Sequence, residues 1–112
     1  MAEKETEINV NEKEFSDRVI GRSKKIPVVV DFYADWCGPC HALGPVLEKV
    51  AKEYRGKFIL AKANVDHCPK ISEKYNVLSI PAVKLFKNGK VVSEFVGFQA
   101  ESKIKEWLDS KL

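Results

Sequence analysis

The chain has 112 residues, 45% of them hydrophobic, which is enough for one domain with its own apolar core. Its formal charge is only +3, and the 19 basic and 16 acidic residues are spread along the sequence without a basic block. This distribution argues against a nucleic-acid-binding protein. No apolar run approaches the roughly 20 residues that span a bilayer, which argues against a membrane protein. We expect a single domain over residues 1–112, with a flexible tail at 1–6.

Cysteine usage and the first residues bear on the cellular compartment. A secreted domain held by disulfides normally carries an even and denser set of cysteines than the three found here, Cys37, Cys40 and Cys68. The start, MAEKETEINVN, is polar and acidic, unlike a signal peptide or an Arg-rich transit peptide. We therefore expect a soluble, cytoplasmic protein, although a mature organellar protein would share these features.

The first elements of the chain are predicted from a polarity pattern and a capping signal. Residues 6–10 alternate in polarity like a short strand. Asn11 and Glu14 form the pattern of a capping box, in which each side chain accepts a hydrogen bond from the other residue's backbone. These signals predict a helix over residues 11–20 that ends at Gly21.

The centre of the sheet is predicted from the run IPVVVDFY at residues 26–33. Its β-branched and aromatic residues are apolar on both faces, which is typical of a strand covered on both sides, and only Asp31 interrupts it. After WCGPC comes a helical pattern of apolar residues from 43 to 54, with charged residues such as Glu48 on the opposite face. Pro45 should kink this helix.

The remaining elements follow in the second half of the chain. We expect a strand at 58–65 and a short helix at 66–75. Two strands at 82–86 and 90–96 should form a hairpin, because Asn-Gly at 88–89 favours a type I′ turn.

A final amphipathic helix completes the predicted fold. Its inward-facing apolar residues are Ile104, Trp107, Leu108 and Leu112. The order β-α-β-α-β-α-β-β-α predicts an α/β protein with a central mixed sheet of about five strands, flanked by about four helices.

The six residues WCGPCH at 36–41 allow three chemistries: a redox dithiol, a covalent haem attachment or part of a zinc site. A haem would need a second axial ligand, but the single methionine is Met1. Zinc could recruit His67 and Cys68, yet these two adjacent residues lead into their own predicted helix and are poorly placed to close a tetrahedron. Both alternatives are therefore weaker than the redox interpretation.

The position of the two cysteines favours redox chemistry. Cys37 lies where a strand meets a helix, beside free backbone N–H groups and the positive end of the helix dipole, which stabilise a thiolate. The thiolate is the nucleophile in disulfide exchange. Cys40, one turn later, should be more buried and placed to attack a mixed disulfide, and Pro39 suits a first helical turn. A permanent disulfide or two inert thiols remain the structural alternative.

Several separated motifs resemble the thioredoxin family, in the same order. They are VVVDFYAD at 28–35, WCGPC at 36–40, Lys62 within AKANVD, SIPAVKLFKNGK at 79–90 and FVGF at 95–98. The resemblance covers residues 6–112 and implies a thioredoxin fold. It implies a protein-disulfide reductase that passes electrons from a thioredoxin reductase to disulfide-containing client proteins and acts as a monomer. It implies no metal, and no bound organic cofactor is expected because the sequence has no phosphate-binding glycine loop.

The resemblance also implies roles for four residues of the catalytic centre. Cys37 would be the attacking thiolate and Cys40 the resolving thiol. Asp31 would be a buried carboxylate that relays the proton of Cys40, with Lys62 as its neighbour. A carboxylate inside an apolar strand should have a raised pKa, which suits this role. Without the resemblance, Asp31 could equally be an edge or solvent-facing residue.

A docking surface is implied beside the cysteines. Pro81 would be a cis-proline whose loop pairs with an extended substrate segment, although a proline at the start of a strand is also common. The apolar rim that binds partners would consist of Trp36, Gly38, Pro39, Ile80, Gly97 and Phe98. Trp36 could instead belong to the core.

The chain departs from the family pattern at a few positions. Members often carry a basic residue and then Met after the second cysteine, where this chain has His41, Ala42 and Leu43, and often Thr where it has Ala82. These changes leave the dithiol chemistry intact but bear on partner preference and redox potential, since His41 can add positive charge at low pH. Cys68 lies outside the motifs and is either a bystander or a regulatory or dimer-forming thiol.

Two other functions fit the sequence less well. An oxidase or isomerase of an oxidising compartment is disfavoured by the Gly-Pro between the cysteines and by the polar start of the chain. A binding module that uses the same surface without redox chemistry would not need the intact dithiol.

Overall fold

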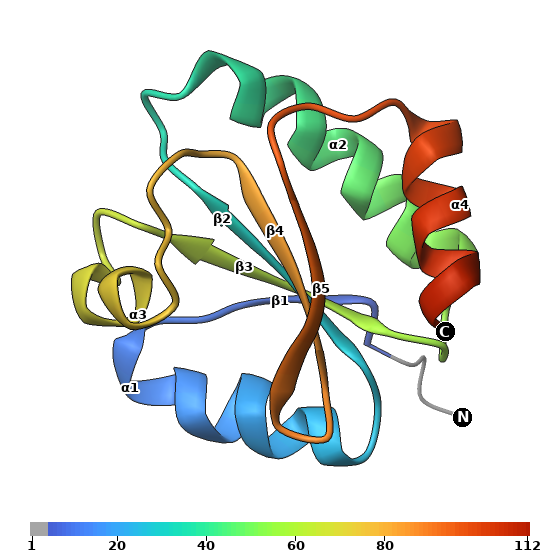
Figure 1. The fold of residues 1–112 in the computed structure, drawn as a ribbon, viewed down its shortest axis with the longest axis horizontal. Coiled ribbons are helices and arrows are strands. Elements are labelled where there is room, and N and C mark those ends of the chain that lie inside the picture. Colours follow the sequence, from blue (N-terminus) through green and yellow to red (C-terminus); the bar gives the residue numbers. More distant parts are fainter. Residues whose placement is uncertain (1–4) are drawn as a thin grey trace.

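A five-stranded sheet forms the centre of the computed structural model, which describes residues 5–112. The strands lie in the order β1-β3-β2-β4-β5, and β1, β3 and β2 are parallel to one another, whereas β4 and β5 are antiparallel to their neighbours (Figure 1). Their bounds are Glu7–Asn9 (β1), Val28–Tyr33 (β2), Ile59–Asn64 (β3), Ala82–Lys87 (β4) and Lys90–Val96 (β5). The predicted mixed sheet is therefore confirmed.

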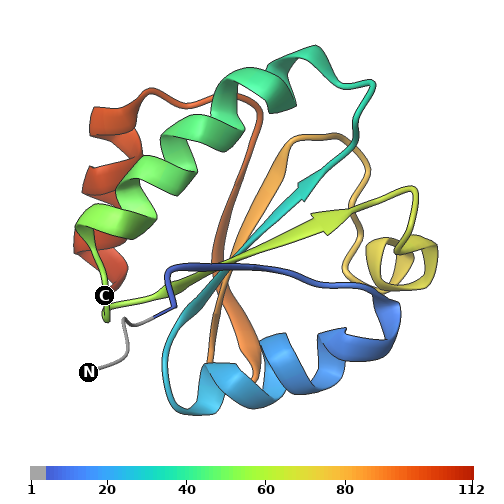
Figure 2. The ribbon, with the colours of Figure 1, turned by 180° about the vertical axis from the view of Figure 1, so that it is seen from behind.

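Helices cover both faces of this sheet. In Figures 1 and 2, α1 and α3 lie on one face and α2 and α4 on the other. The four helices are α1 (Glu12–Phe15), α2 (Gly38–Glu53), α3 (Pro69–Lys74) and α4 (Glu101–Lys111). In β2, Val28, Val30 and Phe32 pack in the core beneath α1 and α3, whereas Val29 packs in the core beneath α2 and α4. This alternation explains why the β2 sequence is apolar on both faces.

The first helix begins as predicted but ends later. The Asn11 side chain accepts a hydrogen bond from the Glu14 backbone (2.9 Å), and the Glu14 side chain accepts one from the Asn11 backbone (3.2 Å), which completes the capping box. The prediction that the helix ends at Gly21 is wrong. The chain continues as a π-helical segment, η1 (Ser16–Gly21), and a 3-10 turn, η2 (Arg22–Lys24). Gly21 keeps a right-handed helical φ of −61°, so it does not form the left-handed cap that glycine often provides.

The predicted tail is only partly described. Residues 1–4 lie outside the described residues. Glu5 forms a salt bridge with Arg22 (2.8 Å), and the Thr6 carbonyl accepts a hydrogen bond from the Leu60 backbone (2.9 Å). Residues 5 and 6, which the sequence assigned to the tail, are therefore bound to the folded domain.

Element boundaries in the second half differ by a few residues from the prediction. The helix expected at 66–75 begins at Pro69, because the Asp66 backbone donates to the Asn64 side chain (2.9 Å) and the chain makes a turn there. The hairpin is confirmed, since Asn88 and Gly89 both have positive φ (53° and 82°), as a type I′ turn requires. Leu112 lies past the end of α4 and is 39% exposed, so its predicted burial is wrong.

The sheet brings three chain segments to one edge. Phe32 near the end of β2 pairs with Ala82 at the start of β4, and Ala82 pairs with Val96 at the end of β5. The loops that follow β2, precede β4 and follow β5 must therefore lie together. These loops carry WCGPC, Ile80-Pro81 and Gly97-Phe98. Within residues 5–112, no helix is both long and apolar enough to cross a membrane.

Candidate redox-active site

Cys37 and Cys40 lie at the N-terminus of α2 and are joined by a disulfide, with their Cα atoms 5.3 Å apart. Cys37 is the N-cap of the helix, and the Cys40 N–H donates a hydrogen bond to the Cys37 sulfur at 3.2 Å. Gly38 and Pro39 are the first helical residues, where the missing N–H of proline leaves no helical bond unmade. The helix dipole and this N–H both favour negative charge on the Cys37 sulfur once the disulfide is reduced. The predicted placement at a strand–helix junction is confirmed.

The two cysteines are equally buried in this disulfide form, at 5% and 6% exposure for Cys37 and Cys40. The prediction that Cys40 is the more buried of the two is therefore wrong here. Both sulfur-bearing residues pack with Ala34, and Ile80 lies against this small cluster. The two cysteines differ in their hydrogen bonding, because the Cys37 sulfur accepts a hydrogen bond from a backbone N–H at the helix N-terminus.

Asp31 is buried inside β2, with only 1% of its surface exposed. Its Oδ1 atom has no hydrogen-bond partner among residues 5–112. Burial raises the pKa of Asp31 from 3.8 to about 6, the positive charge of Lys62 opposes this shift, and the negative charge of Glu48 adds to it. The alternative of an edge or solvent-facing carboxylate is therefore excluded. A carboxyl group with this pKa can exchange protons at cellular pH.

A cleft of about 360 Å³ is lined by both Cys40 and Asp31. Its walls include Asp31, Cys40, His41, Gly44, Glu48 and Lys62. Cys40, the predicted resolving thiol, and Asp31, the predicted proton carrier, therefore line the same cleft.

Lys62 lies beside Asp31 but binds a different residue. It faces Asp31 directly in the parallel β2–β3 ladder, which confirms that the two are neighbours. Its ammonium forms a salt bridge with Glu48 (2.7 Å) and lies 5.3 Å from the centre of the Tyr33 ring. Partial burial acts to lower the pKa of Lys62, but the hydrogen bond and charge of Glu48 outweigh it, and the net shift is upward. Lys62 is therefore a charged lysine at the cleft.

Glu48 is a site residue that the sequence analysis missed. The helical pattern placed it on the polar, solvent-facing side of α2, but it is half-buried over the cleft. Cys40, Gly44 and Glu48 are spaced four residues apart, so they share one stripe of the helix. Gly44 lies on this stripe next to the Lys62–Glu48 pair, and a Cβ atom there would be at ordinary contact distance from both side chains. The repeat of four residues from Cys40 through Gly44 to Glu48 is the signal that could have identified Glu48.

Apolar side chains stand exposed around the disulfide. Trp36 is 71% exposed, and its indole Nε1 donates a hydrogen bond to the Asp66 carboxylate at 2.9 Å, so it is not a core residue. Phe98 is 50% exposed. Leu78, two residues before Ile80, is 90% exposed and was not predicted as part of the rim. Its position two residues before Ile80, which the resemblance did assign to the rim, was the available signal.

The Ile80-Pro81 loop completes this surface. The peptide bond between these residues is cis, as the resemblance implied. The Gly97 N–H donates to the Pro81 carbonyl at 2.8 Å, which ties the loop after β5 to the proline. Around both Gly38 and Gly97 there is open space where a side chain would begin. Gly38 and Pro39 are exposed in the first turn of α2, between the two cysteines of the disulfide.

Comparison with known proteins agrees with this geometry. The thioredoxin family model matches residues 6–110. This chain belongs to the thioredoxin family. It is 38% identical over 104 residues to a thioredoxin of Rickettsia bellii, covering 93% of this chain and 97% of the relative. It is 43% identical over 101 residues to a thioredoxin of Chlorobaculum thiosulfatiphilum, covering 90% and 92%.

Thioredoxins of mitochondria are also similar to this chain. The chain is 44% identical over 95 residues to the mitochondrial thioredoxin of Bos taurus, covering 85% of this chain and 56% of the longer relative. As a thioredoxin-family protein with a cysteine pair at disulfide distance, the chain is a thiol-disulfide oxidoreductase that acts on protein disulfides.

The departures from the thioredoxin family pattern occupy two kinds of position. His41 is exposed at the cleft, with its Nε2 atom 2.6 Å from the Asp35 carbonyl oxygen. Leu43 is fully buried in the core beneath α2 and α4, and Ala82 is buried in β4. Ala42 is exposed beside His41, so these two of the four departures are accessible to a partner.

Cys68 lies in a different part of this thioredoxin-family domain. It is fully buried in the core beneath α1 and α3, and its sulfur lies 3.8 Å from the Val10 carbonyl oxygen. Cys37 and Cys40 belong to a separate buried cluster with Ala34. Across residues 5–112, no three His, Cys, Asp or Glu side chains form a group that could hold a metal ion.

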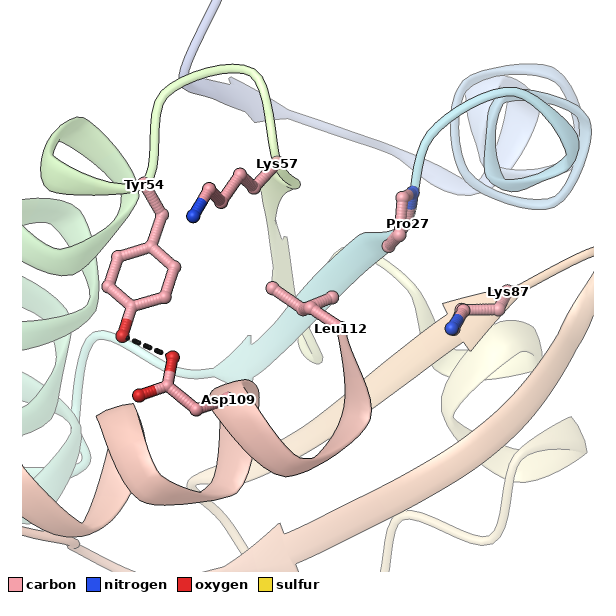
Figure 3. A pocket seen from close by; sticks show the side chains of 6 residues that line it. All are labelled: Pro27, Tyr54, Lys57, Lys87, Asp109 and Leu112. Atoms are coloured by element: carbon pink, nitrogen blue, oxygen red, sulfur yellow. Dashed lines mark hydrogen bonds between the residues drawn. The ribbon is translucent and has the colours of Figure 1, made fainter.

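A second cavity, of about 440 Å³, lies at the other end of the sheet (Figure 3). It is lined by Pro27, Tyr54, Lys57, Lys87, Asp109 and Leu112. Two of these lining residues are hydrogen-bonded to each other, since the Tyr54 hydroxyl donates to the Asp109 carboxylate at 2.7 Å. Because Pro27 precedes β2, whereas Cys37 follows it, this cavity is remote from the cysteines. None of the residues predicted for the redox site lines it.

Proposed function

We propose that Cys37 is the attacking residue of this oxidoreductase and Cys40 the resolving residue. The Cys37 thiolate attacks one sulfur of a client disulfide, forms a mixed disulfide and releases the first client thiolate. Cys40 then loses its proton and attacks the Cys37 sulfur, which forms the Cys37–Cys40 disulfide and releases the second client thiolate. The observation that carries this assignment is the hydrogen bond from the Cys40 N–H to the Cys37 sulfur at the helix N-terminus.

We also propose that Asp31 accepts the proton that Cys40 loses. Two observations support this role. Asp31 and Cys40 line the same cleft, and one oxygen of Asp31 has no hydrogen-bond partner among residues 5–112. A raised pKa makes the carboxylate a stronger base than an exposed one, which suits proton transfer from a thiol.

Clients would dock on the apolar rim around the disulfide. We assign this role to Trp36, Gly38, Pro39, Ile80, Pro81, Gly97 and Phe98, and we add Leu78. Support comes from the exposure of Trp36, Leu78 and Phe98, because exposed apolar patches on soluble proteins often mark interaction sites. An extended client segment would run beside the Ile80-Pro81 loop and pair with its backbone.

Partners and compartment complete the proposal. A thioredoxin reductase would return electrons to the Cys37–Cys40 disulfide. The domain would act as a monomer of 12.7 kDa, and it would do so in the cytoplasm. The unpaired Cys68 supports a reducing compartment. Coupled turnover with an NADPH-dependent and a ferredoxin-dependent reductase would identify the electron source. Sedimentation at twice this mass would contradict the monomer, and exclusive recovery from organelles would contradict the cytoplasm.

The assignment of the cysteine pair is tested by insulin-disulfide reduction with dithiothreitol as the electron source. Cys37→Ser should lose the activity above background, and Cys40→Ser should lose turnover. Cys68→Ser is the matched control, because it removes the one cysteine outside the site, and it should keep near wild-type activity. Full activity of Cys37→Ser would contradict the proposed mechanism.

A further inference from the structure

The charges beside Asp31 are paired in an unexpected way. Lys62 faces Asp31 across the β2–β3 ladder, and it is the cation nearest in register to this buried carboxyl. Even so, the Lys62 ammonium binds the Glu48 carboxylate, at 2.7 Å. Asp31 Oδ1 is left without a hydrogen-bond partner among residues 5–112.

This arrangement depends on the stripe of α2 that faces the cleft. Gly44, one turn before Glu48 on this stripe, lies next to the Lys62–Glu48 pair. A Cβ atom at Gly44 would lie 3.8 Å from the Lys62 Nζ and 4.0 Å from the Glu48 Oε2. The lysine is 20% exposed and the glutamate 33%, so the pair is partly shielded from solvent, which strengthens it relative to a surface pair.

We propose that Glu48 is a positioning residue for the resolving step: it holds the Lys62 ammonium on the α2 side of the cleft and so leaves Asp31 free to accept the proton of Cys40. If Lys62 bound Asp31 instead, the ion pair would stabilise the Asp31 carboxylate and make it a weaker base. This inference rests on the role of Asp31 given under the proposed function.

The other groups around Asp31 do not compete for the same contact. On β4, the residue that pairs with Asp31 is the apolar Val83. The remaining polar groups that line the cleft are Tyr33, Asp35, Cys40 and His41. Of these, Tyr33 lies under the Lys62 ammonium, and His41 contacts the Asp35 carbonyl oxygen. Among charged side chains, Lys62 and Glu48 have the largest effects on Asp31, in opposite directions.

Two neutralising variants separate positioning from a merely structural role. In Glu48→Gln, Asp31 loses the nearby negative charge that acts to raise its pKa, and Lys62 loses its anionic partner and acts on Asp31, so the midpoint of Asp31 titration should fall on both counts. In Lys62→Gln, the cation is removed, so the midpoint should rise. Loss of fold integrity alone would not give shifts of opposite sign. Carbon-13 NMR of the Asp31 carboxyl group in the oxidised protein measures the midpoint directly.

The kinetic consequence is measured on the second half of the reaction. A mixed disulfide is formed between Cys37 and a small thiol reporter, and reporter release is followed by stopped flow from pH 5 to pH 9. For Glu48→Gln we expect the acid limb to move to lower pH and release at pH 7 to be about three- to tenfold slower, since the weakened base comes from one nearby charge. Glu48→Asp should restore most of the wild-type profile.

Glu53→Gln is the matched control, because Glu53 lies on the same helix and also binds a lysine, Lys105, at 3.2 Å, but it lies outside the cleft. It should leave the Asp31 midpoint unchanged. An unchanged or raised midpoint in Glu48→Gln would overturn the inference. If Asp31→Asn keeps the acid limb of reporter release, the proposed role of Asp31 fails instead, even where the NMR midpoints move as expected.

Discussion

The indole Nε1 of Trp36 donates a 2.9 Å hydrogen bond to the Asp66 carboxylate, which comes from the turn after β3. The Asp66 backbone is in turn held by the Asn64 side chain at 2.9 Å. Trp36 is 71% exposed, so little packing fixes its ring. This hydrogen bond therefore orients a large apolar side chain directly beside the nucleophilic cysteine.

Removal of the Asp66 carboxylate should weaken client binding without unfolding the domain. In Asp66→Ala, the Trp36 ring loses the hydrogen bond that orients it, so the ring must become ordered when a client binds, which costs conformational entropy. We therefore expect KM for insulin to rise about three- to tenfold with kcat little changed. The free energy of unfolding should change by less than about 1 kcal/mol, as for other exposed hydrogen bonds. A Trp36→Ala variant with unchanged KM would show that this ring is not part of the docking surface.

Asp31 should make stability depend on pH. Its folded pKa of about 6 exceeds the unfolded value of 3.8, so the folded protein binds this proton more tightly. Stability from this group is therefore complete below pH 3.8 and is lost as pH rises to about 6. Asp31→Asn should be more stable than the wild type at pH 8, by up to about 3 kcal/mol, and should lose this advantage near pH 3.5.

Urea unfolding of the oxidised proteins at the two pH values measures this difference. Asp35→Asn is a suitable control, because Asp35 is exposed and its neutralisation relieves no burial of charge. A stability advantage of Asp31→Asn that is equal at both pH values would mean that charge burial is not its cause.

Cys68 should be inert in the folded protein. Its thiol is fully buried, and burial raises its pKa, so both access and thiolate formation are suppressed. In a Cys37→Ser/Cys40→Ser double variant, Ellman's reagent should find no fast-reacting thiol under native conditions and one thiol per chain in guanidinium. A diamide-induced dimer of this double variant on a non-reducing gel would instead support the regulatory alternative.

The same substitution should have opposite effects on stability at two glycines. Gly44 lies inside α2 with ordinary contact distances around a new Cβ, so Gly44→Ala should stabilise the domain by about 0.5–1 kcal/mol. Gly97 has a φ of +90°, so Gly97→Ala should destabilise it by about 1 kcal/mol despite the open space around it. Urea midpoints of the two variants test both signs, and stabilisation by Gly97→Ala would contradict the backbone argument.

Features that depend on local chemistry could be predicted from the sequence. The Asn11–Glu14 capping box, the Asn88-Gly89 turn and the placement of Cys37 at a helix start all follow from interactions between residues a few positions apart. The burial of Asp31 was implied by the family resemblance, since the apolar strand around it left an edge or solvent-facing position equally open.

Features that depend on contacts between distant segments could not be predicted. Glu48 looks like a solvent-facing residue until β3 places Lys62 beneath it. The sequence predicts a helix end at Gly21 because glycine commonly caps the C-terminus of a helix. In the structure, the chain continues in a helical conformation through Lys24. Tyr33, Val65 and Ile80 pack against the cluster that holds Cys37 and Cys40, and two of them, Val65 and Ile80, come from distant parts of the sequence.

The central claim is that Cys37 attacks the client and Cys40 resolves the mixed disulfide. Its most direct test is the mass spectrometric mapping of the covalent complex that Cys40→Ser forms with a disulfide-containing protein such as insulin. We predict that the complex accumulates and that the client is attached at Cys37, whereas Cys37→Ser forms none. A client attached at Cys40 in the Cys37→Ser variant, with none trapped by Cys40→Ser, would contradict the account.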